Sequence, residues 1–351
     1  MVSLGGIGTA FPPETGQQEI WERFFVRHYA GPYQVLARRL FANAGVERRH
    51  TVVSPLSEDV SGWSTSQRMA RYLAEAVPLG KDAVTGALAA TGLDATDLGM
   101  FVVCSCTGYA APGLDILLAR DLGMGKRTRR LLIGHMGCYA ALPGLGAASE
   151  YVSAHGRPAL LLCLELTSLH MQPPSRDPQQ MIVHALFSDA AAAAVLLPDG
   201  PGERDGRRYV LRDLISVTDT ATADHMTWDI TETGFRMGLS PAVPDVLAAH
   251  VRDLVVELLA PAGLDIRDVE GWAVHPGGPR IIDVVRDECG LTEQDVAESR
   301  QTLANHGNCS SPTVLMVIDA LRRRPSGAPK TVVALAFGPG LTLYAALLTS
   351  S

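Results

Sequence analysis

One strand–turn–helix stretch in the middle of the chain limits the possible folds more than any other feature. It opens with the apolar run Leu131–Ile133, which predicts a short buried strand. The glycine-rich segment Gly134–Gly137 predicts a tight turn, and the small residues after Cys138 predict a helix that ends at Gly156. Pro143 lies slightly inside that helix and predicts a kink. The stretch therefore indicates an α/β unit with a cysteine at the N-terminus of its helix.

The position of Cys138 makes it a candidate nucleophile. Unpaired N–H groups and the helix dipole at a helix N-terminus favour the thiolate, which is the nucleophilic form of cysteine. Most single cysteines are small buried hydrophobic residues, and this is the simplest interpretation of Cys104, Cys106, Cys163, Cys289 and Cys309. For Cys138, a nucleophile and a small buried hydrophobic residue are equally open interpretations until a base and an oxyanion-stabilising group are found elsewhere in the chain.

The rest of the chain predicts an α/β fold in two halves, because apolar strands alternate with helices throughout. The apolar runs are continuous, which is typical of sheets that are covered on both faces. A polar segment rich in Gly and Pro, 198–208, separates an N-terminal half, 1–200, from a C-terminal half, 201–351. In the first half we expect strands at 2–10, 99–106, 158–166 and within 185–197, and helices at 64–76, 81–91 and 114–122. In the second half we expect strands at 209–218, 271–275, 331–337 and 342–348, and helices at 243–259, 280–288 and 312–323.

Composition excludes several classes of function. The net charge of −7 leaves no basic stripe for a nucleic acid, and no apolar run is long enough to span a membrane. The N-terminus lacks the basic and apolar regions of a secretory signal, and the cysteines show neither metal-ligand nor disulfide spacing. We expect a cytoplasmic protein with no metal site and no nucleic-acid or membrane partner.

Two stretches in the second half could supply the partners of Cys138. His275 ends a predicted strand and precedes a rigid Pro-Gly-Gly-Pro turn, a setting that favours a catalytic role. Asn308 follows a glycine and precedes a helix that Ser310 or Ser311 would cap. Taken alone, a histidine is more often a hydrogen-bonded core residue and an asparagine more often a turn residue.

Four motifs, GCYAALPG, WAVHPGGPR, GNCSSP and AFGPGLT, together resemble the chalcone synthase family, the type III polyketide synthases. The resemblance covers essentially the whole chain. It implies a thiolase-like, five-layered α-β-α-β-α fold in a homodimer. It also implies an acyltransferase that uses an acyl-CoA starter and malonyl-CoA extenders, with no metal or organic cofactor.

The resemblance implies a role for each member of the Cys-His-Asn set. Cys138 would hold the starter and the growing chain as a thioester. His275 and Asn308 would donate hydrogen bonds to the malonyl thioester oxygen and so stabilise the enolate that forms when carbon dioxide leaves. His275, as an imidazolium, would also stabilise the Cys138 thiolate.

The resemblance also implies a substrate cavity and a binding site for the CoA phosphates. Phe187 matches the family's gatekeeper phenylalanine, and Met237 takes the place of the second one. The other predicted substrate-site residues are Cys106, His170, Trp228, Ser310, Gly338 and Pro339, and the predicted CoA ligands are Arg48 and Arg49. Trp228 stands where plant enzymes have glycine, and Ala111 where they insert a methionine across the dimer interface. These differences, with Cys106 in its SCTG setting, indicate the bacterial branch and its tetrahydroxynaphthalene synthases.

We expect a chain of modest length, released as a pyrone or cyclised to a resorcinol- or naphthalene-type phenol. Two alternatives stay open. One is a ketoacyl synthase III-like enzyme that makes a single condensation on an acyl carrier protein. The other is a non-catalytic subunit that binds acyl-CoA. A thiolase is disfavoured because the FGPG region supplies no second cysteine as the acid.

Overall fold

The computed structural model describes residues 1–198 and 208–350. Its framework is a nine-stranded sheet with the order β11-β12-β13-β8-β1-β7-β6-β4-β5. The strands of the first half are β1 (Val2–Ala10), β4 (Met100–Cys104), β5 (Arg129–Ile133), β6 (Ala159–Glu165) and β7 (Ala190–Pro198). The strands of the second half are β8 (Tyr209–Thr218), β11 (Gly271–Val274), β12 (Thr331–Gly338) and β13 (Thr342–Ser350). The predicted segment between the halves falls mainly on 199–207, outside the described residues.

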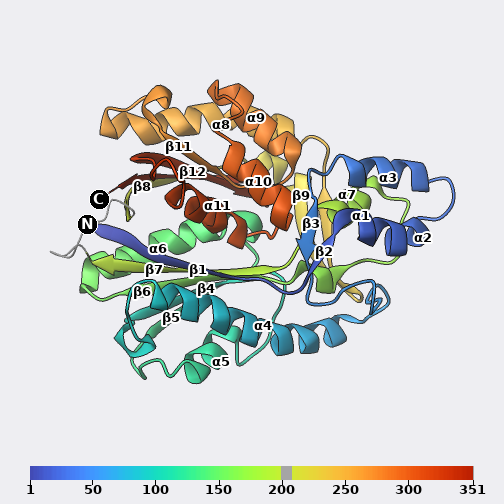
Figure 1. Cartoon of the computed structure of the whole chain (residues 1–351), viewed down its shortest axis with the longest axis horizontal. Helices are drawn as coiled ribbons and strands as arrows, with labels where there is room; N and C mark the ends of the chain where they lie inside the picture. Colours follow the sequence, from blue (N-terminus) through green and yellow to red (C-terminus); the bar gives the residue numbers. More distant parts are fainter. Residues whose placement is uncertain (199–207, 351) are drawn as a thin grey trace.

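Helices and the sheet form alternating layers (Figure 1). Helices α4 (Thr65–Ala89) and α5 (Leu114–Asp121) cover the outer face of the first half, and α8 (Val243–Leu259) and α9 (Pro279–Cys289) cover that of the second. Between them lie α6 (Ala141–His155) and α11 (Pro312–Arg322), which contact strands of both halves. The α-β-α-β-α prediction is confirmed. The two parts of the sheet meet where β1 pairs with β8 at Ser3↔Val210 and Leu4↔Tyr209.

Two predictions about the first half are wrong. The expected helices 64–76 and 81–91 are one helix, α4, which continues through Pro78. Ser64 and Gln67 form a capping box at its start, and buried small residues hold it against β1, where Gly8 allows close approach. Strand β5 is the edge of the sheet and is not buried: Leu131 is 37% and Leu132 43% exposed.

Several elements were not predicted because their sequences are polar or irregular. The most important is α10 (Ala297–His306), which leads directly to Asn308. A separate hairpin, β9 (Met226–Thr231) with β10 (Gly234–Leu239), carries Trp228 and Met237 opposite each other. The sequence predicts a helical, aromatic region that runs to about Phe41, and this region contains α1 (Gln17–Ile20), the π-helical turn η1 (Trp21–Phe25), α2 (Val26–His28) and α3 (Gln34–Ala42). The other elements that were not predicted are β2 (Glu14–Gly16), β3 (Arg48–His50), α7 (Pro178–Leu186) and short 3₁₀ turns.

No helix in 1–198 or 208–350 is both long and apolar enough to cross a membrane.

Candidate active site

Cys138 lies in a 3₁₀ turn, Gly137–Tyr139, immediately before α6. The helix ends at Gly156 in the left-handed region, as predicted. Pro143 is the third residue of α6 and so lies in its first turn. The backbone N–H groups of the first turn have no partner within the helix, so a proline there removes no helical hydrogen bond and gives no reason for the predicted kink. The end of β12 packs directly on this turn. A Cβ added to Gly338 would stand 2.7 Å from the Tyr139 ring and 3.4 Å from the Cys138 backbone nitrogen.

Burial governs the charge states at this site. It raises the pKa of the Cys138 thiol to about 12, and a hydrogen bond with Ser310 opposes this only in part. Burial also lowers the pKa of His275 to about 3. Both groups are therefore neutral in this site at pH 7. This counts against the predicted imidazolium–thiolate pair as its resting state.

The imidazole of His275 is fully buried and its hydrogen-bonding capacity is unused. Among the described residues, neither ring nitrogen of His275 has a partner. The backbone around it is firmly held: the His275 N–H donates to the Leu335 carbonyl (2.8 Å), and the preceding Val274 N–H donates to Ser299 Oγ of α10 (3.1 Å). A buried imidazole without a partner is costly, so this side chain is placed to meet a polar ligand.

Asn308 is joined to the turn that follows His275. Its Nδ2 donates to the Gly277 carbonyl (3.3 Å), its Oδ1 accepts from the Ser310 N–H (2.8 Å), and its backbone pairs with that of Phe187. An amide nitrogen carries two N–H groups, so Asn308 retains one donor for a ligand. The structure thus places Asn308, after α10, next to the turn that follows His275 at the end of β11.

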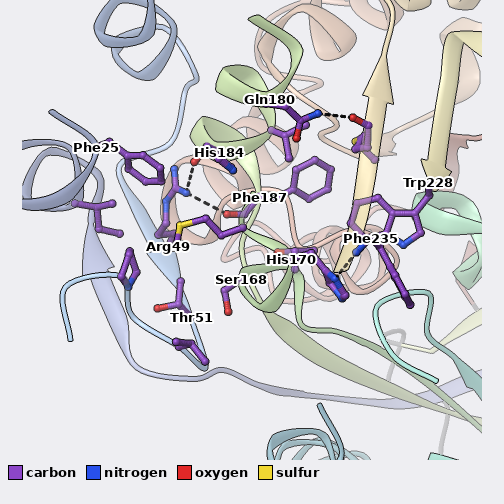
Figure 2. A pocket seen from close by; sticks show the side chains of 17 residues that line it. Phe25, Arg49, Thr51, Ser168, His170, Gln180, His184, Phe187, Trp228 and Phe235 are labelled. Atoms are coloured by element: carbon purple, nitrogen blue, oxygen red, sulfur yellow. Dashed lines mark hydrogen bonds between the residues drawn. The ribbon is translucent and has the colours of Figure 1, made fainter. Parts of the chain in front are cut away.

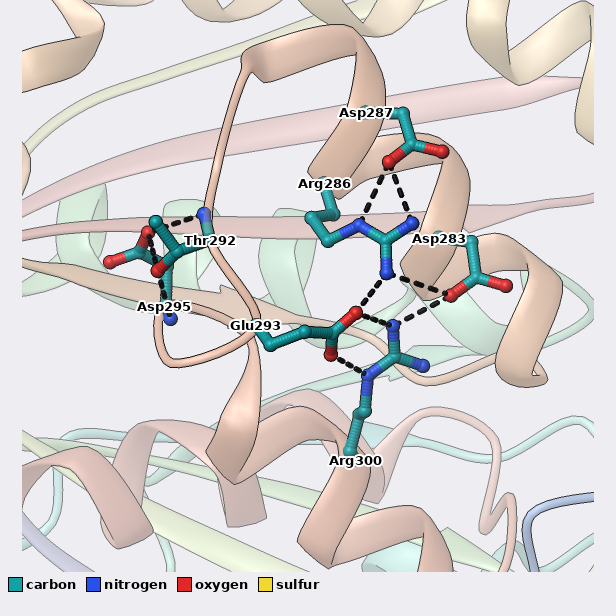
Figure 3. A network of polar contacts seen from close by, with 7 residues as sticks. All are labelled: Asp283, Arg286, Asp287, Thr292, Glu293, Asp295 and Arg300. Carbon is teal, nitrogen blue, oxygen red and sulfur yellow. Dashed lines mark hydrogen bonds and ion pairs between the residues drawn. The ribbon is translucent and has the colours of Figure 1, made fainter.

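An ionic cluster on the surface joins the helices that flank these two residues (Figure 3). Arg300 of α10 pairs with Asp283 of α9 (2.6 Å) and with Glu293 of the intervening loop (2.7 Å), and Arg286 of α9 also pairs with Glu293. Helix α9 begins four residues after His275, and α10 ends two residues before Asn308. The cluster therefore holds together the two helices that position His275 and Asn308.

Glu165, at the end of β6, is a buried carboxyl that the sequence analysis missed. It accepts hydrogen bonds from the Cys106 N–H (3.0 Å), Thr107 Oγ1 (2.7 Å) and Ser311 Oγ (3.0 Å), and burial raises its pKa to about 7. Its signal in the sequence is one acidic residue inside the apolar run of β6. The predicted hydroxyl cap of α11 is wrong, because Ser311 occupies the N-cap position but donates to Glu165.

A small cavity at Cys138, the nucleophile cavity, gathers most of the predicted substrate-site residues. Trp228 is fixed there by its Nε1–H, which donates to the Cys106 carbonyl (2.8 Å). Gly338 is not among the lining residues, but it packs against the Cys138 turn. The residues that line it are Cys106, Thr107, Gly137, Cys138, Thr167, Phe187, Trp228, Met237, Ser310 and Pro339.

His170 faces a second and larger space, the distal cavity, which shares Thr167, Phe187, Trp228 and Met237 with the first (Figure 2). Its Nδ1 accepts from the Phe235 N–H (2.9 Å). Its Nε2 must then carry the proton that it shares with the Thr107 carbonyl (2.6 Å). Burial lowers the pKa of His170 to about 4, so the ring is neutral.

The two predicted CoA ligands differ in exposure. Arg48 lies at the surface, where it donates to Asn305 Oδ1 (3.0 Å). Arg49 is only 4% exposed, and its guanidinium donates to the carbonyls of His184 (2.6 Å) and Ala185 (2.6 Å). The burial of Arg49 counts against its predicted contact with a phosphate. Within the described ranges, no three His, Cys, Asp or Glu side chains are grouped to hold a metal ion.

Comparison with known proteins gives matches along the whole chain. Residues 2–201 match the model of the chalcone and stilbene synthase N-terminal domain, and residues 213–351 match that of the C-terminal domain. The 1,3,6,8-tetrahydroxynaphthalene synthase of Streptomyces peucetius subsp. caesius is 34% identical, over 99% of this chain and 92% of that protein. The alpha-pyrone synthesis polyketide synthase-like Pks18 of Mycobacterium tuberculosis is 32% identical, over 87% of this chain and 80% of its own.

The solved structures agree on the fold. PKS-I from the brown alga Ectocarpus siliculosus superposes with a TM-score of 0.92 at 28% identity, and covers 100% of this chain and 98% of its own. The C-terminal type III polyketide synthase domain of Steely1 from Dictyostelium has a TM-score of 0.93 at 23% identity over 99% of both chains.

Proposed function

Because the chain belongs to the chalcone and stilbene synthase family, the type III polyketide synthases, and is an acyltransferase, we propose how its own residues carry out that activity. Cys138 carries the acyl chain, and His275 and Asn308 stabilise the enolate formed from malonyl-CoA. The observation that supports this most strongly is the buried imidazole of His275, which has no partner among the described residues, together with the hydrogen bond from Asn308 to the nearby Gly277 carbonyl.

Loading begins when Cys138 Sγ attacks the carbonyl carbon of the starter thioester. The thiol proton passes to a ring nitrogen of His275 that has no partner among the described residues. The bond between the acyl carbon and the CoA sulfur breaks, and His275 gives the proton to that sulfur, so CoA leaves as the free thiol. The acyl group is then a thioester of Cys138.

Extension begins when malonyl-CoA places its thioester oxygen against His275 and Asn308. Loss of carbon dioxide leaves the electron pair of the broken bond as an enolate, and N–H donors at these two residues stabilise the negative oxygen. The enolate carbon attacks the Cys138 thioester and displaces the cysteine sulfur. The lengthened chain, now on CoA, reloads onto Cys138 for the next cycle.

We propose that the product is a pyrone or a resorcinol- or naphthalene-type phenol. The relatives whose names include an alpha-pyrone and a tetrahydroxynaphthalene support this range. The indole of Trp228, held against Cys106, limits the space in which the chain can fold.

We also propose a homodimer that forms through β5. Among the described residues this strand pairs only with β4, and it carries Leu131 and Leu132, which are 37% and 43% exposed. Such an edge strand favours pairing with another chain. The half 1–200 would carry the nucleophile and the half 201–351 the two hydrogen-bond donors. Arg48 remains the candidate contact for a CoA phosphate.

The proposed steps need acyl-CoA and malonyl-CoA and no further cofactor, since the cysteine, the two donors and the loss of carbon dioxide supply all the chemistry. All six cysteines are free, which is compatible with a reducing cytoplasm.

Separate assays of loading and decarboxylation test these roles. Cys138→Ala should abolish covalent acylation by an acyl-CoA and retain decarboxylation of malonyl-CoA. His275→Ala and Asn308→Asp should lower decarboxylation by about 10²- to 10³-fold, the usual effect of losing one oxyanion donor. Gln301→Ala, at an exposed position on α10, is the matched control and should behave as wild type. Decarboxylation at the wild-type rate in the His275 variant would contradict the proposal.

A further inference from the structure

Two histidines outside the cavities, His50 of β3 and His306 at the end of α10, are bonded to each other through their rings. His50 Nε2 lies 3.0 Å from His306 Nδ1, and His50 Nδ1 lies 3.0 Å from the Pro12 carbonyl oxygen. The ring of Phe11 stacks on that of His306, with centroids 4.5 Å apart and planes 12° apart. We call the contact between the two imidazoles the histidine bridge. The proposed catalytic steps do not use it.

The partners of the two rings fix the direction of the bridge. Burial lowers the pKa of both imidazoles below the ordinary 6.5, that of His306 to about 4, so both are neutral at pH 7. The Pro12 carbonyl can only accept a hydrogen bond, so His50 carries its proton on Nδ1 and its Nε2 is an acceptor. His306 must therefore donate from Nδ1 to His50 Nε2. The bridge needs a donor on the side of α10.

The backbones of His50 and Asn308 are both bonded to the short segment between α7 and β7. The His50 N–H donates to Ser188 Oγ (2.8 Å), and the His50 carbonyl accepts from the Asp189 N–H (2.9 Å). The Asn308 N–H donates to the Leu186 carbonyl (2.9 Å), and the Asn308 carbonyl accepts from the Ser188 N–H (3.0 Å). One strip of backbone therefore holds both residues.

A single glycine, Gly307, separates His306 from Asn308. Its φ of +71° is in the left-handed region, and a Cβ added to it would stand 2.9 Å from the Ser188 Cβ. The chain is thus pressed against the strip at this point. The histidine bridge supplies the last link, because it returns from His306 to His50. The result is a closed ring of contacts in which Asn308 is held from both sides.

We propose that His50 and His306 are positioning residues for Asn308, and that their hydrogen bond keeps the asparagine amide in place for the enolate oxygen. This rests on the proposed function, which makes Asn308 a donor to that oxygen. The amide already donates one N–H to the Gly277 carbonyl (3.3 Å), so its other N–H is the one to be aimed. A displaced donor weakens transition-state stabilisation more than substrate binding, so the loss should appear in kcat rather than in KM.

Two variants at position 306 separate the hydrogen bond from the ring stack. His306→Phe removes the hydrogen bond and keeps a ring against Phe11. His306→Asn keeps a nitrogen donor at about the place of Nδ1 and gives up the stack. The matched control is His155→Leu, since His155 is also the last residue of its helix, α6, and is exposed. The position-306 variants are also made in an Asn308→Ala background.

For each protein, kcat and KM are measured for decarboxylation of malonyl-CoA, and acylation of Cys138 by hexanoyl-CoA is measured separately. His306→Phe should lower kcat for decarboxylation by about tenfold, less than the loss of about 10²- to 10³-fold expected when a donor itself is removed. Its KM and its acylation should not change. His306→Asn and His155→Leu should stay close to wild type. In the Asn308→Ala background, His306→Phe should cause no further loss.

Nitrogen NMR of the wild type labelled in histidine tests the bridge without a variant. At pH 7.5 both His50 and His306 should carry their proton on Nδ1. A proton on Nε2 of either ring would contradict the direction of the bridge and overturn the inference.

Three kinetic results would also overturn it. The first is a wild-type kcat in His306→Phe. The second is an equal loss in His306→Phe and His306→Asn, or a loss of acylation as large as that of decarboxylation, which would give the pair a role in the fold alone. The third is a tenfold loss that persists in the Asn308→Ala background. Wild-type decarboxylation in Asn308→Ala itself would instead remove the proposed function of Asn308.

Discussion

Replacement of Glu165 by glutamine should change the stability of the protein in a pH-dependent way. The carboxyl is buried, and its pKa rises from the ordinary 4.5 to about 7 in the folded chain, chiefly because of burial. A carboxyl with a raised pKa stabilises the fold when it is protonated. This contribution is complete below pH 4.5 and is lost as the pH rises through 7. A glutamine cannot ionise, so the variant should not show the loss.

The size of the effect follows from the two pKa values. Their separation of about 2.5 pH units corresponds to about 3 kcal/mol, and most of it falls between pH 5 and pH 9. The free energy of unfolding of Glu165→Gln, relative to wild type, should therefore rise by about 2.5 kcal/mol over that interval. Loss of the hydrogen bonds to Thr107 or Ser311 changes the free energy of unfolding of the variant by the same amount at every pH.

Equilibrium urea unfolding at a series of pH values measures this difference. The matched control is Glu150→Gln on α6, which removes an exposed carboxylate and should follow the wild type at every pH. Glu165 also raises the pKa of Cys138 through its negative charge. At a fixed pH above 7, Cys138 in Glu165→Gln should therefore react faster with iodoacetamide. If the free energies of variant and wild type run parallel from pH 5 to pH 9, the assignment of a raised pKa to Glu165 is refuted.

Two further predictions concern the cavity and the assembly. Trp228→Gly should widen the nucleophile cavity and release the Cys106 carbonyl. Products detected by mass spectrometry should then gain at least one malonyl extension or come from larger starters. Unchanged product length and starter range would show that the Trp228 side chain does not limit the cavity. Leu132→Arg should shift the protein towards monomer in size-exclusion chromatography with light scattering. Val35→Arg, at a position 79% exposed on α3, should leave the mass unchanged; a wild-type mass in the Leu132 variant would exclude β5 as the interface.

Much of the fold could be predicted because its signals are local. The apolar runs gave the main strands, and Gly156 marked the end of α6 correctly. The exposure of β5 could not be predicted, since an apolar run has the same sequence whether it faces a core or a partner chain. Helix α10 escaped prediction because it has little apolar periodicity, and α4 was split because Pro78 usually breaks a helix.

The site was predictable only where a motif carried it. The motifs WAVHPGGPR and GNCSSP singled out His275 and Asn308, and a hydrogen bond joins Asn308 to Gly277 in the turn after His275. The charge states could not be predicted from sequence, since they depend on how deeply Cys138 and His275 are buried. The importance of Glu165 likewise depends on long-range contacts. It is one polar residue in an apolar segment, and only the fold shows what it contacts.

The most direct test of the central claim is mass spectrometry of the products and of the intact protein. Purified enzyme receives malonyl-CoA alone and with aliphatic and aromatic acyl-CoA starters, beside Cys138→Ala. A synthase that loads Cys138 should show an acyl adduct on that residue and products with several extensions, and both should vanish in the variant. Dependence of every product on an acyl carrier protein would favour a ketoacyl synthase III-like enzyme. Absence of any adduct on Cys138 would contradict the account.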